Sequence, residues 1–566
     1  MTKIRPTLFA IALGLAVSFA LSACASQTET ASNAGVDSRT TEVSRSSPSA
    51  RYAANAGAAP EIVLAGRPHT AAPGPPVMAP PPAGKPNGPV MDGHAEYPGT
   101  ERFKNYGENP WTDTSKDSLS TFAIDVDTAS YTLMRSDILV GNKLPAPASV
   151  RPEEYVNYFD YDYEPPAKGS HPFAVHLEAA DSPYTAGRKL VRVAIKGYEV
   201  PSAERKPCNL VFLIDVSGSM GGRLPLVKHA LEQLLERLDS RDTLGIVVYA
   251  GREAVLMQPT RVRERGFVRN IINGLQSGGG TAGAAGIRTA YKMAREHYLK
   301  DGINRVVLCT DGDFNVGLTG DALVNEVAAQ RDHGVGLSTF LFGRGNINDA
   351  TVEQLANKGN GNHAYIDSPG EAVRAMGEKV VGMLQVIAQD VKIQVEFSND
   401  AVKRYRLIGY ENRDIADQDF RNDAVDAGEL GAGHSVTALY EAELMPNAET
   451  DTDQPLATVR LRYKKPDSTS QDEATEMSVS LPMSRISGAF ADASPSFQFA
   501  TAVAWFAQLM KRSQNVERAT LDRLIDIARR TAGDDPDRKE FLALAIKASD
   551  MPELYEVVKP AGATDN

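Results

Sequence analysis

The stretch Asn209-Leu-Val-Phe-Leu-Ile-Asp215-Val-Ser-Gly-Ser219 decides the fold of this chain. Its apolar run, Leu210 to Ile214, ends in a carboxylate. An uninterrupted apolar run of this length is typical of a strand that is buried on both faces of a parallel sheet. Ligands of such sheets bind beyond the carboxyl ends of the strands. Asp215 and the two serines after it are therefore expected at a ligand-binding edge.

Helix and strand patterns alternate after this stretch. The expected strands cover residues 243–249, 254–257, 305–309, 336–342 and 363–366, and the expected helices cover 224–238, 263–275, 284–298, 321–333, 349–356 and 371–388. Such alternation predicts the α/β fold class, with a central doubly wound, mostly parallel, Rossmann-like sheet over residues 206–388.

Smaller regions are expected on both sides of this domain. Residues 106–205 are predicted to form a smaller α+β region, with a strand entering a helix at 120–130, an aromatic-rich helix at 151–163 and antiparallel strands over 173–197. Residues 389–566 are predicted to form strands and then helices. The expected strands are 391–397, 405–410, 435–444, 457–463 and 474–481, and the expected helices are 497–510, 516–532 and 538–548.

Asp125 and Asp127 superficially suggest a calcium loop. The segment lacks the glycine and the twelfth-position glutamate of an EF-hand. Strand polarity or helix capping is the preferred interpretation of this pair.

The N-terminal residues have the pattern of a secretory signal. Lys3 and Arg5 precede an apolar stretch from Leu8 to Ala20, which is shorter than the ~20 residues of a membrane-spanning helix. The stretch ends in Leu21-Ser22-Ala23-Cys24, which resembles the lipobox of bacterial lipoproteins. This resemblance implies removal of residues 1–23 and lipidation of Cys24. With Ala25 as the second mature residue, it also implies transfer to the outer membrane.

Residues 24–105 are rich in Ala, Ser, Thr, Gly and Pro, with few aromatic residues and no sustained apolar periodicity. Such a segment cannot bury enough surface to offset its ordering entropy. We interpret it as a disordered tether, whose ~80 residues would span about 50 Å between a lipid anchor and the folded part.

Composition excludes several functions. The net charge of −12 argues against a nucleic-acid backbone as ligand, because such binding depends on clustered Lys and Arg. The three cysteines Cys24, Cys208 and Cys309 are too few for a disulfide framework or a thiolate zinc site. The segments discussed above lack the Gly-Lys-Ser/Thr of a P-loop, and no HExxH or GxSxG motif occurs, so neither a nucleotide nor catalysis is expected.

Three separated motifs resemble the metal-ion-dependent adhesion site of von Willebrand factor type A domains. That family has the pattern Asp-x-Ser-x-Ser, then a Thr, then an Asp. Asp215, Ser217 and Ser219 match the first loop, Thr281 in Gly278-Gly-Gly-Thr-Ala-Gly matches the second, and Asp311 in Cys309-Thr-Asp-Gly matches the third. With its flanking regions, the chain resembles a family of bacterial lipoproteins that contain this domain.

These residue types suit a hard divalent cation. Mg²⁺ takes about six oxygen ligands and usually keeps some waters. The resemblance implies neutral ligation by the hydroxyls and charge neutralisation by Asp215 and Asp311. The cation, Mg²⁺ or alternatively Mn²⁺ or Ca²⁺, would then bind an Asp or Glu carboxylate of a protein partner. The serines and Thr281 also suit helix caps, and Asp311 suits a turn.

The sequence therefore predicts a lipid-anchored binding or scaffolding protein of the cell envelope. A metal-dependent enzyme or enzyme accessory subunit remains an alternative, and so does a metal with a purely structural role.

Cys208 and Cys309 are expected to remain free thiols. If the strands ending at Asp215 and Asp311 are parallel neighbours with these aspartates level, the cysteines are offset by five residues, or about 16 Å. A disulfide tolerates Cα separations of only about 4.4 to 6.8 Å.

Overall fold

The computed structural model describes most of the chain after residue 101. The described residues are 95–96 and 102–557, except 126, 168, 170, 202, 281–282, 313–320, 332, 344–348, 449–451, 467, 469–471 and 518–519. The predicted lipidation site Cys24 and the predicted site residue Thr281 lie outside them. In this part of the chain, no helix is both long enough and apolar enough to cross a bilayer.

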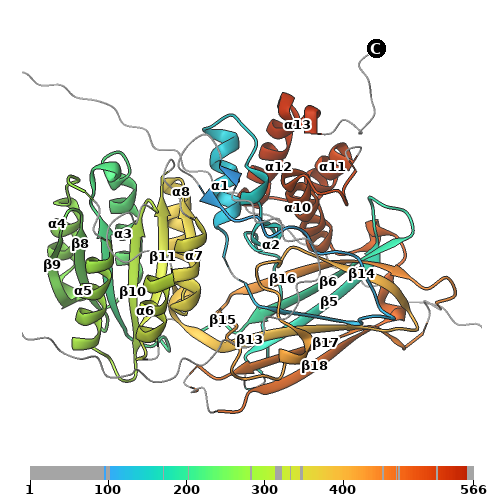
Figure 1. Ribbon diagram of the computed structural model, residues 1–566, viewed down its shortest axis with the longest axis horizontal. Helices are drawn as coiled ribbons and strands as arrows, with labels where there is room; N and C mark the ends of the chain where they lie inside the picture. The colour runs from blue at the N-terminus through green and yellow to red at the C-terminus, as the bar shows by residue number, and fades with distance from the viewer. Residues whose placement is uncertain are drawn as a thin grey trace, which may run out of the picture. The chain divides into compact units, whose positions relative to one another are not determined.

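The central domain contains a six-stranded sheet in the order β12-β11-β10-β7-β8-β9 (Figure 1). Its strands are β7 (Cys208–Asp215), β8 (Thr243–Tyr249), β9 (Glu253–Arg261), β10 (Ile303–Thr310), β11 (Gly336–Phe342) and β12 (His363–Ile366). All neighbours are parallel except β9, which is an antiparallel edge strand. The predicted α/β fold class is confirmed.

The chain builds this sheet outward from β7 in both directions. It first adds β8 and β9 on one side, and then returns to add β10, β11 and β12 on the other. The order therefore reverses between β7 and β10. In open α/β sheets, ligands bind in the crevice beyond the carboxyl ends of the strands at such a reversal.

Helices cover both faces of the sheet (Figure 1). They are α3 (Leu224–Arg237), α4 (Arg265–Asn273), α5 (Gly283–Glu296), α6 (Asp321–Arg331) and α7 (Asp349–Lys358). Leu210, Phe212 and Ile214 of β7 belong to the core under α3 and α4. Val211 and Leu213 belong to the core under α5, α6 and α7. Because successive strand residues point to opposite faces, β7 has to be apolar throughout.

The two flanking regions share one pair of sheets. One sheet has the order β15-β13-β17-β18, with β4 also paired to β13, and the other has the order β19-β5-β6-β16-β14-β3. The strands are β3 (Thr112–Asp113), β4 (Leu119–Ala123), β5 (Phe173–Asp181), β6 (Arg188–Gly197), β13 (Val386–Phe397), β14 (Val402–Ile408), β15 (Gly428–Gly431), β16 (Ser435–Leu444), β17 (Pro455–Lys464), β18 (Thr475–Pro482) and β19 (Ile486–Ser487). A common hydrophobic core contains residues of both sheets.

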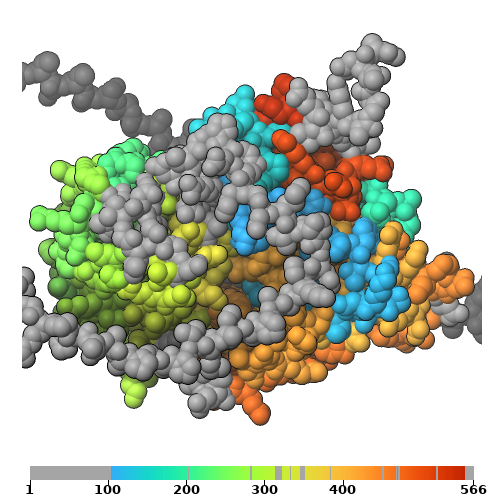
Figure 2. All heavy atoms as spheres, in the orientation of Figure 1, coloured from blue at the N-terminus to red at the C-terminus, as the bar shows by residue number. Residues whose placement is uncertain are grey.

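N-terminal and C-terminal strands are thus interleaved. The predicted hairpin of β5 and β6 is present, but β16 continues its sheet across a nine-pair antiparallel register. In Figure 2 the N-terminal residues, in blue, lie against the orange surface of the C-terminal strands, in agreement with the β4–β13 pairing. The predicted domain boundaries stay a prediction. The strands of the two flanking regions pair with each other across the central domain's sequence.

A helical cluster packs beside this sandwich. Its members are α1 (Ala129–Leu139), α2 (Pro152–Val156), α10 (Pro495–Lys511), α11 (Leu521–Thr531), α12 (Pro536–Ser549) and α13 (Pro552–Val557). Their shared core is rich in aromatic rings, including Tyr131, Phe159 and Phe499.

The predicted aromatic helix over 151–163 was wrong in length. Only Pro152–Val156 is helical. Tyr155, Tyr158, Phe159 and Tyr161 all enter the same core. In a continuous helix, Tyr155, Tyr158 and Phe159 would share one face, but Tyr161 would point away from this core, because side chains turn by about 100° per residue. Tertiary packing therefore overrides the helical pattern.

The predicted helix over 371–388 is helical as far as Leu384, but it is interrupted and its predicted end was wrong. The segment forms α8 (Pro369–Ala372), a π-helical turn η4 (Val373–Glu378) and α9 (Val380–Leu384). β13 then starts at Val386, because its first residues pair with β15 and β17. The apolar run at 386–388 suits a strand as well as a helix, and pairing with distant strands decides between them.

Cys208 and Cys309 are free and buried, as predicted. The predicted strand alignment was wrong by one residue. Ile303 pairs with Cys208 and Cys309 with Ile214, so the cysteines are offset by six positions, from 303 to 309. Six residues correspond to about 20 Å along the strands, which keeps a disulfide out of reach.

Asp125 and Asp127 form a buried ionic cluster with Arg413. The guanidinium donates to both oxygens of Asp125, at 2.9 and 3.1 Å, and to Asp127 at 3.1 Å. The other oxygen of Asp127 accepts from the His363 backbone N–H at 2.8 Å, at the start of β12. The pair thus joins the N-terminal segment to the central sheet. Its role is structural, but through an ionic cluster with Arg413 and not through the predicted strand polarity or helix capping.

Replacing Arg413 with Ala should destabilise the fold by about 3–5 kcal/mol, because it leaves buried carboxylates without their counter-charge. Urea denaturation followed by circular dichroism measures this loss. Arg530→Ala is the control, since Arg530 makes an exposed pair with Asp526 on α11 and should change stability by less than about 0.5 kcal/mol. Equal effects of the two substitutions would contradict the role given to Arg413.

Candidate functional site

Asp215, the last residue of β7, is fully buried at the carboxyl edge of the sheet. Its carboxylate accepts from the Ser217 backbone N–H at 2.8 Å and from the Thr310 hydroxyl at 3.4 Å. Burial raises the pKa of Asp215 to about 6, although the hydrogen bonds from Ser217 favour the charged form. Among the described residues, no cationic side chain forms an ion pair with Asp215. The site therefore holds a buried carboxylate that lacks a counter-ion.

The loop after Asp215 brings two hydroxyls together. The Oγ atoms of Ser217 and Ser219 are 3.1 Å apart. Backbone hydrogen bonds tie this loop to the glycine-rich loop that precedes Thr281: Gly278 N–H donates to the Val216 carbonyl at 2.7 Å, and Gly218 N–H donates to the Gly279 carbonyl at 3.0 Å. Gly279 has φ +91°, a conformation that favours glycine.

Asp311 lies directly after β10 and is also buried. Its neighbour Thr310 donates to Asp215, so the ends of β7 and β10 meet at this point. Gly312 has φ +93° and donates its N–H to the Thr310 hydroxyl at 3.1 Å, which shapes the turn. The structure therefore brings Asp215, Ser217, Ser219 and Asp311 to the point where the strand order reverses.

Arg223 belongs to the same site and was not predicted. Its guanidinium donates to the Asp311 carboxylate and, at 3.1 Å, to the Ser219 carbonyl. Gly343 gives the side chain room, because a Cβ there would lie 2.0 Å from the Arg223 Nε. The available sequence signal for this contact was the position of Arg223, four residues after Ser219. An arginine at the start of a helix is too common to stand out in a sequence.

The residues present fit a hard divalent cation. Two carboxylates and two adjacent hydroxyls supply only oxygen, which Mg²⁺, Mn²⁺ and Ca²⁺ prefer. In the described residues, no group of three or more His, Cys, Asp or Glu side chains could hold a metal. A cation at this site would therefore need the serine hydroxyls as ligands. The uncompensated negative charge of buried Asp215 favours binding of such a cation.

Comparison with known proteins identifies the class. The von Willebrand factor type A domain family matches residues 209–414, a range that includes the site. A family described as von Willebrand factor matches residues 97–192, and the C-terminal family of the uncharacterized protein YfbK matches residues 382–551. The central domain thus has the von Willebrand factor type A fold.

A relative identifies the family more closely. The uncharacterized protein YfbK of Escherichia coli K12 is 36% identical over 489 residues, which cover 82% of this chain and 84% of that protein. The chain belongs to the YfbK family.

Other similarities are more distant. The uncharacterized protein sll0103 of Synechocystis is 25% identical over 295 residues, covering 50% of this chain and 68% of that protein. Among solved structures, a von Willebrand factor type A protein from Catenulispora acidiphila is 16% identical with a TM-score of 0.39, covering 65% of this chain and 89% of that one.

The charge of Asp215 should destabilise the protein when divalent cations are removed. Because its pKa rises from 3.8 to about 6 on folding, wild-type stability falls as the pH increases through this range and stays lower above it. Asp215→Asn abolishes this cost, so at pH 8 in chelator it should be more stable by about 1–3 kcal/mol. Urea denaturation at pH 8 and pH 4 measures the difference, which should shrink at pH 4. A less stable Asp215→Asn protein at pH 8 would contradict the assignment.

Proposed function

We propose that this protein binds a protein partner through a divalent cation held by Asp215, Ser217, Ser219, Thr281 and Asp311. The observation that carries the proposal is the buried carboxylate of Asp215, which has no cationic partner among the described residues and lies beside two hydroxyls 3.1 Å apart. A buried charge of this kind is costly unless a counter-ion neutralises it.

The site residues would have different roles in binding the cation. The hydroxyls supply neutral ligands, and the two aspartates supply negative charge. Bound Mg²⁺ would supply an electrophilic centre for an Asp or Glu carboxylate of the partner. Arg223 lies at the same edge and pairs with Asp311, so it holds the Asp311 carboxylate in place beside the hydroxyls. Binding of this kind requires no nucleophile and no general base, and we propose no catalytic reaction.

We further propose that the protein is anchored by Cys24 in the cell envelope, in the outer membrane. The support is the sequence Leu21-Ser22-Ala23-Cys24 after a short apolar stretch, followed by the tether over residues 24–105. The acidic net charge of −12 agrees with a protein ligand and disfavours nucleic acid. A tether would let the binding domain reach partners away from the membrane surface.

Affinity capture of envelope proteins with the purified protein tests the proposed cation-dependent binding. Wild-type protein in Mg²⁺ should retain a partner that is released by a chelator and absent with Asp215→Ala. Screening the same preparation for Mg²⁺-dependent hydrolase activity tests the enzyme alternative, for which we expect no turnover.

The double substitution Ser217→Ala with Ser219→Ala should abolish Mg²⁺ binding measured by calorimetry, because water only partly replaces two fixed oxygens. The fold should persist, since the loop lies at the sheet edge and the core lies in the strands. Partner capture should disappear together with the cation. Ser478→Ala with Ser480→Ala, two exposed positions of β18, is the matched control. A folded site variant that binds no Mg²⁺ but captures partner as well as wild type would refute the proposal.

The substitution Cys24→Ser should release the protein from membranes into a soluble fraction, because it removes the sulfur that carries the lipid. Fractionation of cells followed by immunoblotting measures the distribution. Cys208→Ser is the control, since this buried thiol lies within the folded domain. Continued sedimentation of exported Cys24→Ser protein with membranes would overturn the proposed anchor.

A further inference from the structure

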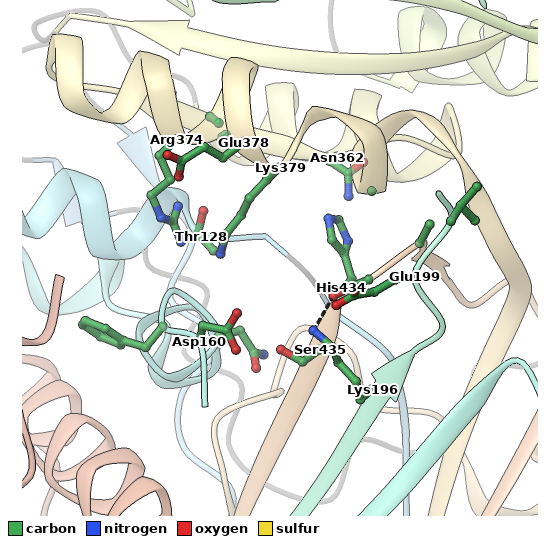
Figure 3. A pocket seen from close by; sticks show the side chains of 18 of the residues that line it. Thr128, Asp160, Lys196, Glu199, Asn362, Arg374, Glu378, Lys379, His434 and Ser435 are labelled. Atoms are coloured by element: carbon green, nitrogen blue, oxygen red, sulfur yellow. Dashed lines mark hydrogen bonds between the residues drawn. The ribbon is translucent and has the colours of Figure 1, made fainter. Parts of the chain in front are cut away.

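A cavity of about 310 Å³ lies away from the adhesion site, where three parts of the chain meet (Figure 3). The central domain contributes residues of η4 and the start of α9, the sandwich contributes the end of β6 and the start of β16, and the N-terminal segment contributes residues near α2. Its volume is at the lower end of the range of small-molecule sites.

Cationic side chains enter this cavity from different elements. Arg374 comes from η4 and Lys379 from the residue after η4. Lys196 comes from β6 on the opposite side, where the imidazole of His434 lies next to it (Figure 3). Lys196 and Arg374 are buried, with exposed fractions of 7% each. We call Lys196, Lys379 and His434 the basic cluster, in which the two lysines carry the positive charge.

Arg374 is already neutralised. It pairs with Glu371 at 3.1 Å and stacks on the Tyr158 ring, with its guanidinium 3.7 Å from the ring centroid. It therefore contributes a positive wall but few free donors.

The lysines of the basic cluster, in contrast, have no ion-pair partner among the described residues. Lys379 Nζ donates only a long 3.4 Å hydrogen bond to the Tyr158 carbonyl, and Lys196 Nζ donates to the Gly433 carbonyl at 2.8 Å. Within the described part of the chain, neither ammonium has a carboxylate within ion-pair distance. His434 Nδ1 is buried there without a hydrogen-bond partner. Buried donors in this state cost free energy that a ligand can recover.

Burial and the neighbouring Arg374 lower the pKa of Lys379 to about 7. Burial likewise lowers the pKa of His434 to about 3, so its imidazole is neutral near pH 7. The cavity thus contains two lysines without ion-pair partners among the described residues. A neutral imidazole and the solvent-exposed carboxylates of three acidic residues line it as well.

We propose that this cavity binds a small molecule through a phosphate group. Each lysine retains two N–H donors beyond its carbonyl contact, and the two lysines approach from different sides (Figure 3). A tetrahedral phosphate offers oxygens in all these directions, whereas a carboxylate offers two in one plane. The remaining volume accommodates a short organic part.

The acidic residues of the cavity limit its ligands. Asp160, Glu199 and Glu378 line it and are exposed to solvent. Their charges repel a polyanion that extends out of the cavity. We therefore restrict the proposed ligand to a compact monophosphate, because a nucleic acid or a polyphosphate would place more negative charge beside these carboxylates.

Calorimetry with the purified full chain in chelator tests the proposal, with inorganic phosphate and glycerol 3-phosphate as probes. Both should bind saturably, and neutral glycerol should not. Lys379→Met and Lys196→Met should each weaken binding at least tenfold. Lys292→Met, at an exposed position of α5, should leave it unchanged. The Ser217→Ala, Ser219→Ala protein should also bind phosphate normally, which separates this cavity from the adhesion site.

A pH series identifies the group responsible. The charged groups facing Lys379 are Arg374, Asp160, Glu371 and Asp537, and Lys196 and His434 line the same cavity. Sulfate stays a dianion from pH 6 to pH 8.5, so any change in its affinity over this range comes from the protein. Since Lys379 loses its proton near pH 7, sulfate affinity should fall by roughly tenfold over this range. Lys379→Met should abolish the dependence.

Several results would overturn the proposal. One is folded wild-type protein that takes up no phosphate or glycerol 3-phosphate. Another is retention of wild-type affinity by both lysine variants. Tighter binding of acetate than of phosphate would refute the phosphate assignment. Removing either unpaired ammonium relieves a buried charge, so both variants are expected to fold.

Discussion

The double burial of β7 is the constraint on which the rest of the central domain depends. Its side chains supply the cores on both faces of the sheet, and its backbone pairs with β8 on one edge and β10 on the other. A strand held on four sides cannot shift without disrupting two cores and two ladders of hydrogen bonds. Asp215 is thereby fixed at the sheet edge, where the protein can tolerate a costly buried charge.

Ionic contacts join the central domain to the regions around it. Arg135 of α1 pairs with Asp367 and Glu371 of the central domain and with Glu540 of α12. The Arg413 cluster forms a second connection, to the start of β12. Removing one member of such a buried network leaves the others without compensation. These contacts specify which surfaces meet, in a way that apolar packing alone does not.

The sequence allowed prediction of those features that depend on local pattern. The apolar run at Leu210–Ile214 identified β7, and the residues after it identified three members of the site. The fourth, Asp311, follows the apolar strand β10. Arg223 escaped notice because its role depends on the position of Asp311, which is distant in sequence. The one-residue error in the β7–β10 register has the same origin, since turn lengths decide it. The sharing of sheets by the two flanks was not predictable, because antiparallel pairing over long separations leaves no local signal.

The interleaved sandwich has a consequence for how the chain reaches its native state. Gln394 of β13 donates to Thr121 of β4, 273 positions earlier. The N-terminal strands cannot complete their sheets until the entire central domain and the strands after it are available. Contacts of such high sequence separation slow folding, and unpaired strand edges are prone to aggregate in the meantime. During synthesis from the N-terminus, the central domain can form its sheet first, because that sheet contains only β7 to β12. The flanking sheets of β3 to β6 stay incomplete until the C-terminal strands are synthesised.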